Sequence, residues 1–302
     1  MKYKLIIVRY GEIALKGKET RKRFENTLIS NIKNALGKNL SNKIIKEWGR
    51  IYVYATQIDQ CLNVLQRIFG ITSISPALQT LSNMDSMSIL AVNISKEELN
   101  KKKSFAIRAT RTGEHEFTSQ DVAIKIGNEI VKATKAGVNL SNPDFELFIE
   151  VRNENAYLFI KKISGTGGMP LGTQGKILAL IDAPESILAA WYLMRRGCKT
   201  IFATTKESNK NILKSFMENW FIKSDTLTLD SEKNLVEELN TIAIEKNCDA
   251  IATGHTILDK SQNILSDIKQ LKKHVKFPIL HPLIAMDKEQ INQKCKKIGL
   301  SV

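Results

Sequence analysis

The first 78 residues alternate between continuous apolar runs and helical spacings of apolar side chains. Residues 5–8 form an apolar run typical of a buried strand, and apolar side chains then recur at every fourth position over residues 18–36. That spacing predicts an amphipathic helix that ends before Gly37. The same criteria predict a strand over residues 47–55, a helix over 61–69 and a strand over 71–78. This β-α-β-α-β order predicts a ferredoxin-like α+β domain over residues 1–78.

A second group of elements occupies residues 79–165. The pattern predicts, in order, a helix over residues 86–99, a strand over 104–109, a helix over 119–136 and strands over 146–151 and 156–163. Ser119 is the candidate N-cap of the second helix, because its hydroxyl could accept a hydrogen bond from a free N–H of the first turn. Gly137 is the candidate stop. We expect a second, separate α/β domain here.

Residues 164–175 contain five glycines and have no helical or strand period. Such a segment is typical of a linker or a functional loop, and we place the linker at residues 166–175. Strands and helices then alternate: strands are expected over residues 177–181, 200–204, 226–229 and 250–252, and helices over 184–196, 209–221 and 233–246. Strict alternation predicts a doubly wound parallel sheet, so residues 176–302 should form a Rossmann-like domain and the chain as a whole should be α/β.

The charge of the chain is unevenly distributed. Of a formal net charge of +14, residues 1–175 contribute 26 Lys and Arg against 16 Asp and Glu, a net +10. A field of this sign attracts polyanions, and phosphate contacts can supply most of the sequence-independent affinity for nucleic acid. A soluble, lysine-rich protein without such a partner would show the same composition, so charge alone leaves both readings open.

Several classes of protein are excluded or disfavoured. The longest apolar run, residues 187–194, is eight residues, far below the roughly 20 needed to span a bilayer. The N-terminus has no secretory pattern, so we expect a cytoplasmic protein without a membrane partner. The four cysteines, Cys61, Cys198, Cys248 and Cys295, are too far apart for a zinc knuckle or a redox pair. Buried, reduced thiols are expected, with Cys198 the nearest to a reactive one, and no metal site is predicted.

Four short motifs, in register along the chain, resemble the tRNA 4-thiouridine synthetase family. Residues 8–18, VRYGEIALKGK, are similar to the opening of these proteins. Residues 105–113, FAIRATRTG, with FTS at 117–119 and NPD at 142–144, resemble its RNA-binding THUMP domain. Residues 165–176 are similar to its junction into the catalytic domain, and residues 278–288, PILHPLIAMDK, to a late motif. The resemblance implies a ferredoxin-like domain, a THUMP domain over 79–165 and a PP-loop domain over 176–302.

The resemblance implies binding of the acceptor end of tRNA, and basic residues in the first two domains are the candidate contacts. One group lies at the end of the first strand and the start of the first helix: Arg9, Lys16, Lys18, Arg21, Lys22 and Arg23. The other lies in the THUMP-like region: Arg108, Arg111, Lys161 and Lys162. Each could instead be a solvated surface charge, and Lys101, Lys102 and Lys103 are interpreted as a polar turn.

The phosphate-binding loop of the family is altered in this chain. In the family it reads S-G-G-x-D-S after the first strand of the third domain, where glycine N–H groups at a helix N-terminus approach the pyrophosphate of ATP. The matching residues 181–186 read I-D-A-P-E-S. Asp182 places a carboxylate where phosphate oxygens would lie, and two unit charges about 4 Å apart at an effective dielectric near 20 repel by roughly 4 kcal/mol. That energy corresponds to about three decades of affinity.

We therefore expect no cofactor and name no catalytic residue. ATP and Mg²⁺ would be bound only if the altered loop still holds phosphate. The candidate nucleotide contacts are Asp182, Ala183, Glu185, Ser186 and, at the end of a later strand, His255. The function that fits best is a tRNA-binding protein of tRNA modification that does not carry out adenylation itself. Two alternatives stay open: an active ATP-dependent uridine-thiolating enzyme, and a scaffold for a separate modification enzyme. A homodimer also stays open.

Overall fold

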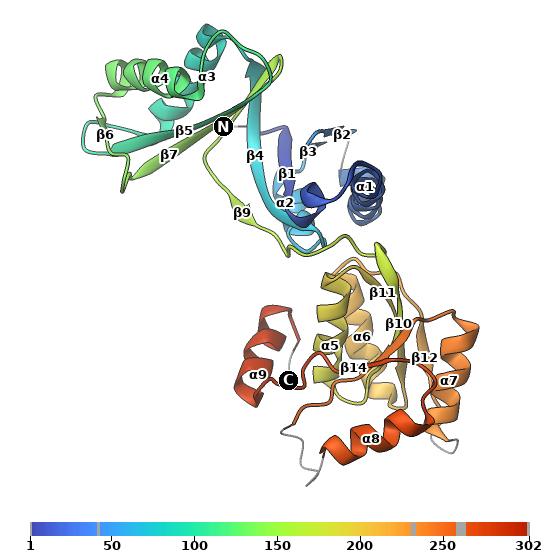
Figure 1. Cartoon of the computed structure of the whole chain (residues 1–302). Helices are drawn as coiled ribbons and strands as arrows, with labels where there is room; N and C mark the ends of the chain where they lie inside the picture. The colour runs from blue at the N-terminus through green and yellow to red at the C-terminus, as the bar shows by residue number, and fades with distance from the viewer. Residues whose placement is uncertain (1, 41–42, 231–233, 258–263, 301–302) are drawn as a thin grey trace. The chain divides into compact units, whose positions relative to one another are not determined.

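The computed structural model describes residues 2–40, 43–230, 234–257 and 264–300 (Figure 1). The chain divides into two compact units. Unit 1 comprises Met1–Arg9, Gly37–Asn63 and Ser73–Ser164, and unit 2 comprises Tyr10–Leu36, Val64–Thr72 and Gly165–Val302. The segments that form each unit are therefore interleaved in the sequence. The domains expected from the sequence are each one continuous segment instead, and their limits stay a prediction.

The strands of the N-terminal half form one mixed sheet in the order β2-β3-β1-β4-β8-β7-β5-β6, with β9 paired to β4. They are β1 (Leu5–Tyr10), β2 (Lys43–Glu47), β3 (Arg50–Tyr54), β4 (Ile71–Leu81), β5 (Ser104–Thr112), β6 (Gly137–Val138), β7 (Phe145–Arg152), β8 (Asn155–Phe159) and β9 (Ile163–Ser164). The long β4 pairs with β8 at its second half, from Leu78 to Leu81, so one strand serves both expected domains.

The single strand expected over residues 47–55 was wrong. The structure has a hairpin in which β2 and β3 pair antiparallel, with Glu47 opposite Arg50. The turn is Trp48-Gly49, and Gly49 has φ +74°, in the left-handed region that glycine adopts without a steric penalty. The sequence of β2, Lys-Ile-Ile-Lys-Glu, has two adjacent isoleucines and so lacks the alternation of apolar and polar side chains that predicts a strand. The added strand completes the β-α-β-β-α-β order of a ferredoxin-like fold.

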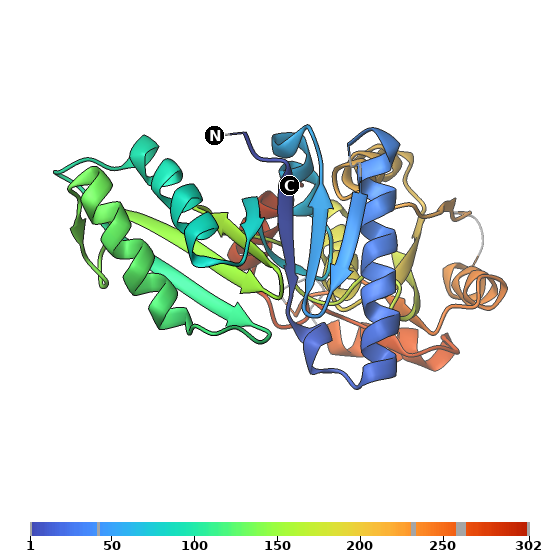
Figure 2. The same ribbon diagram turned by 90° about the horizontal axis from the view of Figure 1, so that it is seen from above.

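Helices α3 (Met84–Glu98) and α4 (Ser119–Thr134) cover one face of the sheet at β5 and β7, as Figure 2 shows. Their apolar side chains pack on alternate residues of these strands, and the enclosed core includes Ile126, Leu147 and Ile149. The N-cap of α4 is Thr118 rather than Ser119, since Thr118 and Asp121 form a capping box. The expected stop at Gly137 was also wrong: Lys135 ends the helix in the left-handed conformation and Gly137 begins β6.

Two helices precede β4. Helix α1 (Lys18–Leu40) follows a short 3-10 helix, η1 (Glu12–Leu15), and α2 (Ile58–Leu65) follows β3. Gly37 has a non-helical backbone with φ +62° inside α1. The regular helix therefore breaks at Gly37, as the spacing of its apolar residues predicts. Its buried side chains are the expected ones, Phe24, Leu28, Ile32 and Leu36.

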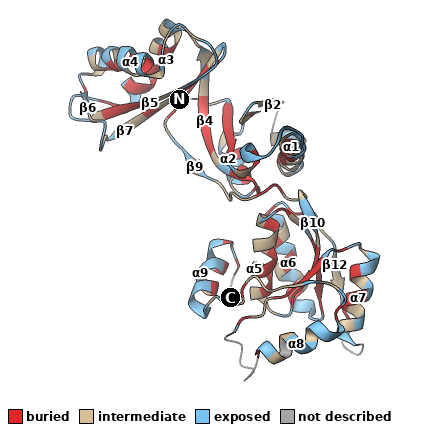
Figure 3. Ribbon diagram, in the orientation of Figure 1, coloured by how far each residue is buried: buried red, intermediate tan, exposed pale blue. Residues whose placement is uncertain are grey.

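The C-terminal part of unit 2 is a parallel sheet covered by helices, as expected. The order of its strands is β12-β11-β10-β13-β14, with bounds β10 (Gln174–Leu180), β11 (Cys198–Thr204), β12 (Thr226–Thr228), β13 (Ala250–Ala252) and β14 (Ile279–Leu280). The helices are α5 (Pro184–Arg195), α6 (Glu207–Asn219), α7 (Leu235–Glu245), α8 (Ile264–His274) and α9 (Lys288–Lys297). Figure 3 shows burial concentrated on β10, β11 and the inner sides of α5 and α6. The start expected for α7 at residue 233 lies outside the described residues.

The glycine-rich segment is hydrogen-bonded along its length and does not form a free linker. Gly167 exchanges backbone hydrogen bonds with Gly70 and Ile71, at 2.9 and 2.7 Å. Further along, the Gly172 N–H donates to the Gly197 carbonyl at 2.8 Å. Gly168, with φ +76°, passes so close to Arg195 that a Cβ there would lie 2.1 Å from the Arg195 carbonyl oxygen. We refer to residues 165–173 as the strap.

A search of the described helices finds none with the length and apolar character required to cross a membrane.

Candidate functional sites

The first basic group lies at the start of α1, in unit 2. Lys16, Lys18, Lys22 and Arg23 are exposed, and Arg21 is half-buried. Lys18 and Lys22 are four residues apart on the helix and so share a face. Four of these positive charges, those of Lys18, Arg21, Lys22 and Arg23, lie on the first two turns of α1 and oppose the helix dipole, at a cost of a few tenths of a kcal/mol to about 1 kcal/mol each. An anionic partner at this surface would offset that cost.

Arg9, expected in the same group, is instead buried in unit 1. Its guanidinium bonds both the Glu150 carboxylate, at 2.7 and 3.0 Å, and the Ser75 hydroxyl at 2.9 Å. The other carboxylate oxygen of Glu150 accepts from Arg50 at 2.9 Å. Burial raises the pKa of Glu150, but the charges and hydrogen bonds of Arg9 and Arg50 outweigh it and hold that pKa below its ordinary value. Arg9 therefore joins strands within unit 1, and we do not include it among the RNA contacts.

The second basic group lies on unit 1, and its members Arg108 and Lys162 lie on and beside the sheet face opposite α3 and α4. Arg108 donates to Glu146 at 2.7 Å and to the Leu140 carbonyl at 2.8 Å. It lies opposite Phe148 in the β5–β7 register, and the Lys162 ammonium lies 5.5 Å from the centre of the Phe148 ring. The structure therefore brings Arg108 and Lys162 to one aromatic residue. Lys161 and Lys162 are both exposed.

Arg111 is exposed at the end of β5, where its guanidinium donates to the Gly113 carbonyl at 2.8 Å. Gly113 has φ +100°, so the chain turns sharply there. A guanidinium that makes one such hydrogen bond has further N–H groups, and two of them can still donate parallel hydrogen bonds to a phosphate. Arg111 thus keeps its predicted place as a candidate contact.

The candidate nucleotide residues meet at the carboxyl ends of the parallel strands of unit 2. Chain order reverses at β10, because β11 follows on one side and β13 lies on the other. Such a switch point is where doubly wound sheets bind ligands. The Ser186 hydroxyl donates to the Asp182 carboxylate. A Cβ on Gly254 would lie 2.5 Å from the Ser186 oxygen, so the Gly254-His255 backbone packs directly against the start of α5.

Three further residues at this edge were not predicted. The Lys206 ammonium donates to the Asp182 carbonyl at 2.9 Å, and the Asn209 amide donates to the Ile181 carbonyl at 3.0 Å. The His281 ring lies 5.5 Å from that of His255, and its Nδ1 is 2.7 Å from the Thr253 hydroxyl. Burial, and then the charge of His255, lower the pKa of His281. All three follow the ends of parallel strands, a positional signal that was available in the sequence.

The residues at the start of α5 do not fit a pyrophosphate. Ala183, at the N-cap, has no side-chain donor. Pro184 has no N–H, and the Ser186 N–H already donates to the Ala183 carbonyl at 3.0 Å. The exposed Asp182 carboxylate adds negative charge at the same point. Glu185 is half-buried in the first turn and adds a second carboxylate. Among the positions that the structure describes, no group of three metal-binding side chains occurs.

The cysteines are poor nucleophiles in this fold. Burial and then Asp249 raise the pKa of Cys198, and burial and then Glu185 raise that of Cys295 to about 11. Since the thiolate is the reactive form, neither is activated.

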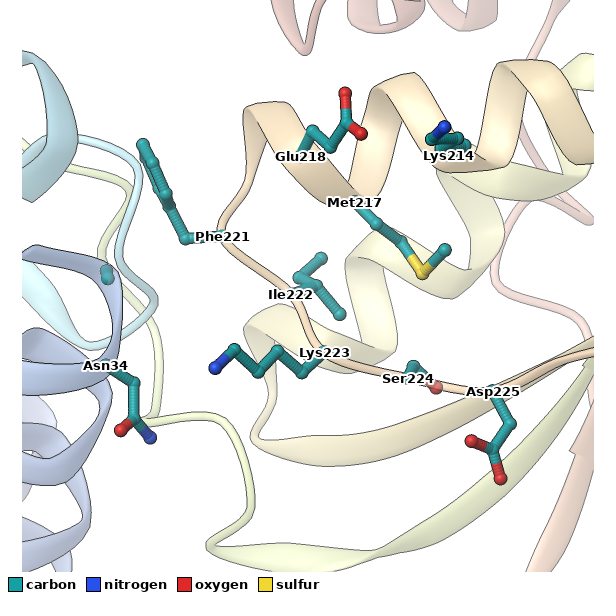
Figure 4. Close-up of a pocket in the computed structure, with 10 residues that line it drawn as sticks. Asn34, Lys214, Met217, Glu218, Phe221, Ile222, Lys223, Ser224 and Asp225 are labelled. Atoms are coloured by element: carbon teal, nitrogen blue, oxygen red, sulfur yellow. The ribbon is translucent and has the colours of Figure 1, made fainter. Parts of the chain in front are cut away.

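A cavity of about 720 Å³ lies at the opposite, amino edge of the unit 2 sheet. Asn34 of α1 faces Lys223 across it, and Met217 and Ile222 form its apolar wall (Figure 4). Lys214 and Lys223 are balanced by Glu218 and Asp225 among its lining residues. The cavity contains none of the predicted site residues, and its lining has no net charge that would select a phosphate.

Three family models match this chain in order. Residues 5–75 match the ThiI ferredoxin-like domain, residues 82–161 the THUMP domain, and residues 210–301 the family described as thiamine biosynthesis protein (ThiI). The third match begins downstream of residues 181–186. The ferredoxin-like and THUMP predictions are therefore confirmed.

Relatives and solved structures agree with these matches. The chain is 32% identical to a probable tRNA sulfurtransferase of Methanobrevibacter smithii, over 99% of this chain and 87% of the relative. It is 34% identical to that of Saccharolobus solfataricus, over 98% and 86%. A solved protein of Pyrococcus horikoshii superposes with a TM-score of 0.84 at 29% identity, over 98% and 100% of the two chains. A 4-thiouridine synthetase, solved in complex with RNA and with bound ATP, gives 0.82 at 26% identity, over 98% and 85%.

Proposed function

This chain belongs to the tRNA sulfurtransferase family, and from that premise we propose that it binds the acceptor end of tRNA and acts in tRNA modification without adenylating the RNA itself. The proposal that this chain binds tRNA rests on the THUMP match over residues 82–161. This match lies within residues 1–175, which have a net charge of +10. The solved 4-thiouridine synthetase that superposes over 98% of this chain is itself an RNA complex.

The proposed contacts are the basic residues of the two groups other than Arg9, all of them exposed or half-buried. They are Lys16, Lys18, Arg21, Lys22 and Arg23 at the start of α1, and Arg108, Arg111, Lys161 and Lys162 on unit 1. Arg108 should attract phosphate the least of these residues, because its ion pair with Glu146 neutralises part of its charge. Phosphate contacts of this kind fix the position of an RNA without reading its sequence.

Binding is tested by matched charge removal. The double variant Lys161→Ala/Lys162→Ala removes two exposed charges, of which that of Lys162 lies next to Phe148. Lys101→Ala/Lys102→Ala removes two exposed charges from a turn of the same unit. The first should weaken tRNA binding by about tenfold or more, and the second by less than threefold, since only phosphate contacts release counterions. Equal effects of the two variants would contradict the assigned surface.

The catalytic half of the proposal rests on the start of α5. Asp182 bonds Ser186 there, and with Pro184 and Ala183 it leaves few donors for a phosphate. We expect ATP to bind in the millimolar range or more weakly, from a repulsion of about 4 kcal/mol. Calorimetry with ATP and Mg²⁺, followed by a pyrophosphate-release assay with tRNA, tests it. Micromolar binding or tRNA-stimulated release would overturn this half alone.

Active ATP-dependent thiolation is the second candidate, favoured by the ATP bound to the solved 4-thiouridine synthetase. It predicts that pyrophosphate release appears with tRNA and a sulfur donor. A scaffold role predicts instead that a modification enzyme co-purifies with the chain. Mass spectrometry of tRNA nucleosides from cells lacking this protein decides whether any modification depends on it at all.

A further inference from the structure

The tip of the β2–β3 hairpin carries an exposed tryptophan. The Trp48 side chain is 68% exposed. Among the residues that the structure describes, only one other aromatic residue is classed as exposed, Phe221 at 36%. An indole exposed to water lacks the stabilisation that burial of its apolar surface would give. Binding of a partner over the ring would supply that stabilisation.

The backbone beneath this ring is held by two arginines. Arg152 of β7 donates to the Trp48 carbonyl at 2.5 Å, and Arg50 donates to the next carbonyl, that of Gly49, at 2.8 Å. Arg50 is fixed in turn by Glu150 at 2.9 Å, and the Arg152 side chain, 8% exposed, lies 3.9 Å from Glu47. The hairpin tip is thereby bound to the THUMP sheet by groups of both expected domains, within unit 1.

This arrangement fixes the main chain of Trp48, while most of the surface of the residue stays open to solvent. A ring held in this way loses little conformational entropy when a flat ligand stacks on it. Unpaired bases are the flat groups of RNA, and they stack on aromatic side chains whatever their sequence, because every base has a π face. The charge around the tip suits an anionic chain, since residues 43–50 carry Lys43, Lys46 and Arg50 against Glu47.

We propose that Trp48 stacks on an unpaired nucleotide of the bound RNA, and that the Arg50–Glu150–Arg152 framework holds the hairpin tip in place for that contact. The proposal rests on the proposed RNA binding and adds a specific role to it. Lysine contacts alone bind paired and unpaired RNA through phosphate, whereas a stacking ring favours RNA with a free base.

The test uses the full chain and two RNAs, a blunt duplex and the same duplex with a single-stranded 3′ overhang. Trp48→Ala should weaken binding of the overhang RNA by about 5- to 100-fold and leave blunt-duplex binding within about twofold. Trp48→Phe should retain most of the affinity and Trp48→Leu should not, because leucine keeps the apolar area but has no π face. Ile89→Ala, which truncates another exposed apolar side chain of unit 1, 65% exposed, is the matched control.

The slope of affinity against salt should be the same for Trp48→Ala and the parent chain, since no charge is removed. Equal loss on both RNAs, or no loss on the overhang RNA, would overturn the stacking role while leaving the proposed RNA binding intact. A change in oligomeric state with unchanged RNA affinity would place the ring in a protein contact and also overturn it. Failure of the parent chain to bind either RNA would remove the proposed function itself.

Discussion

The Ser186 hydroxyl donates a hydrogen bond to the Asp182 carboxylate at the N-terminus of α5. A helix N-terminus favours a negative charge, and in this chain Asp182 supplies that charge internally. At the point where a doubly wound sheet would bind a phosphate, the Ser186 hydroxyl is therefore already bonded to a carboxylate of the chain itself.

Removing that charge should improve ATP binding. We predict that Asp182→Asn strengthens binding of ATP with Mg²⁺ by at least about tenfold and at most about a thousandfold, the range set by a repulsion of roughly 4 kcal/mol. Asp225→Asn, which neutralises an exposed carboxylate at the other edge of the same sheet, should leave it unchanged. Calorimetry measures both. Equal affinities of parent and Asp182→Asn would show that the carboxylate does not oppose phosphate.

The buried carboxylate of Glu150 should be important for the stability of unit 1. Glu150→Gln would leave Arg9 and Arg50 without their counter-charge, and breaking a buried ion pair costs about 3–5 kcal/mol. Urea unfolding followed by circular dichroism measures the loss. Glu129→Gln, which removes an exposed i,i+3 pair with Lys132, should cost less than about 0.5 kcal/mol. A Glu150→Gln loss as small as that would contradict the role assigned to the network.

The same carboxylate gives a pH dependence. The pKa of Glu150 in the folded chain lies below its ordinary value. The carboxylate therefore makes its whole contribution to the free energy of unfolding above the pKa that it has in the unfolded chain, near 4.3. This contribution is lost as the pH falls through the folded pKa. Stability measured from pH 7 downward should therefore decline more steeply in the parent chain than in Glu150→Gln. Parallel curves would show that Glu150 is not the group that titrates.

The strap should tolerate no side chain at Gly168. Alanine there would combine φ +76° with a contact of 2.1 Å to the Arg195 carbonyl oxygen, and we expect it to destabilise unit 2 by more than about 1 kcal/mol. Gly17→Ala, which meets no atom within 4 Å, should change the unfolding free energy by no more than about 0.5 kcal/mol. If the two substitutions behave alike in urea unfolding, the segment is a free linker as its composition suggested.

The sequence was most informative where hydrophobic spacing alone decides the structure. The apolar face of α1, the parallel sheet of unit 2 and its strand β13 follow from periodicity. Asp182 and Ser186 were identified through the resemblance to the phosphate-binding loop of the family, and His255 through its position after a strand. Hairpin β2–β3 was missed because β2 reads Lys-Ile-Ile-Lys-Glu and does not alternate between apolar and polar side chains.

The burial of Arg9 could not be predicted, because it depends on Glu150, 141 residues away. The strap was interpreted from its glycines as a linker or a functional loop, and in the structure those glycines allow close backbone approach to Ile71 and Arg195. In both cases long-range pairing, which no local pattern records, decides the role of the residue.

RNA binding through phosphate is the central claim, and filter binding of the full chain to tRNA over a range of salt concentrations tests it most directly. With four or more of the exposed basic residues on phosphates, the logarithm of the affinity should fall against the logarithm of salt with a slope of about −3 or steeper. The slope should become less steep by about 1.5 in Lys161→Ala/Lys162→Ala. A flat response, or no tRNA binding at low salt, would contradict the claim.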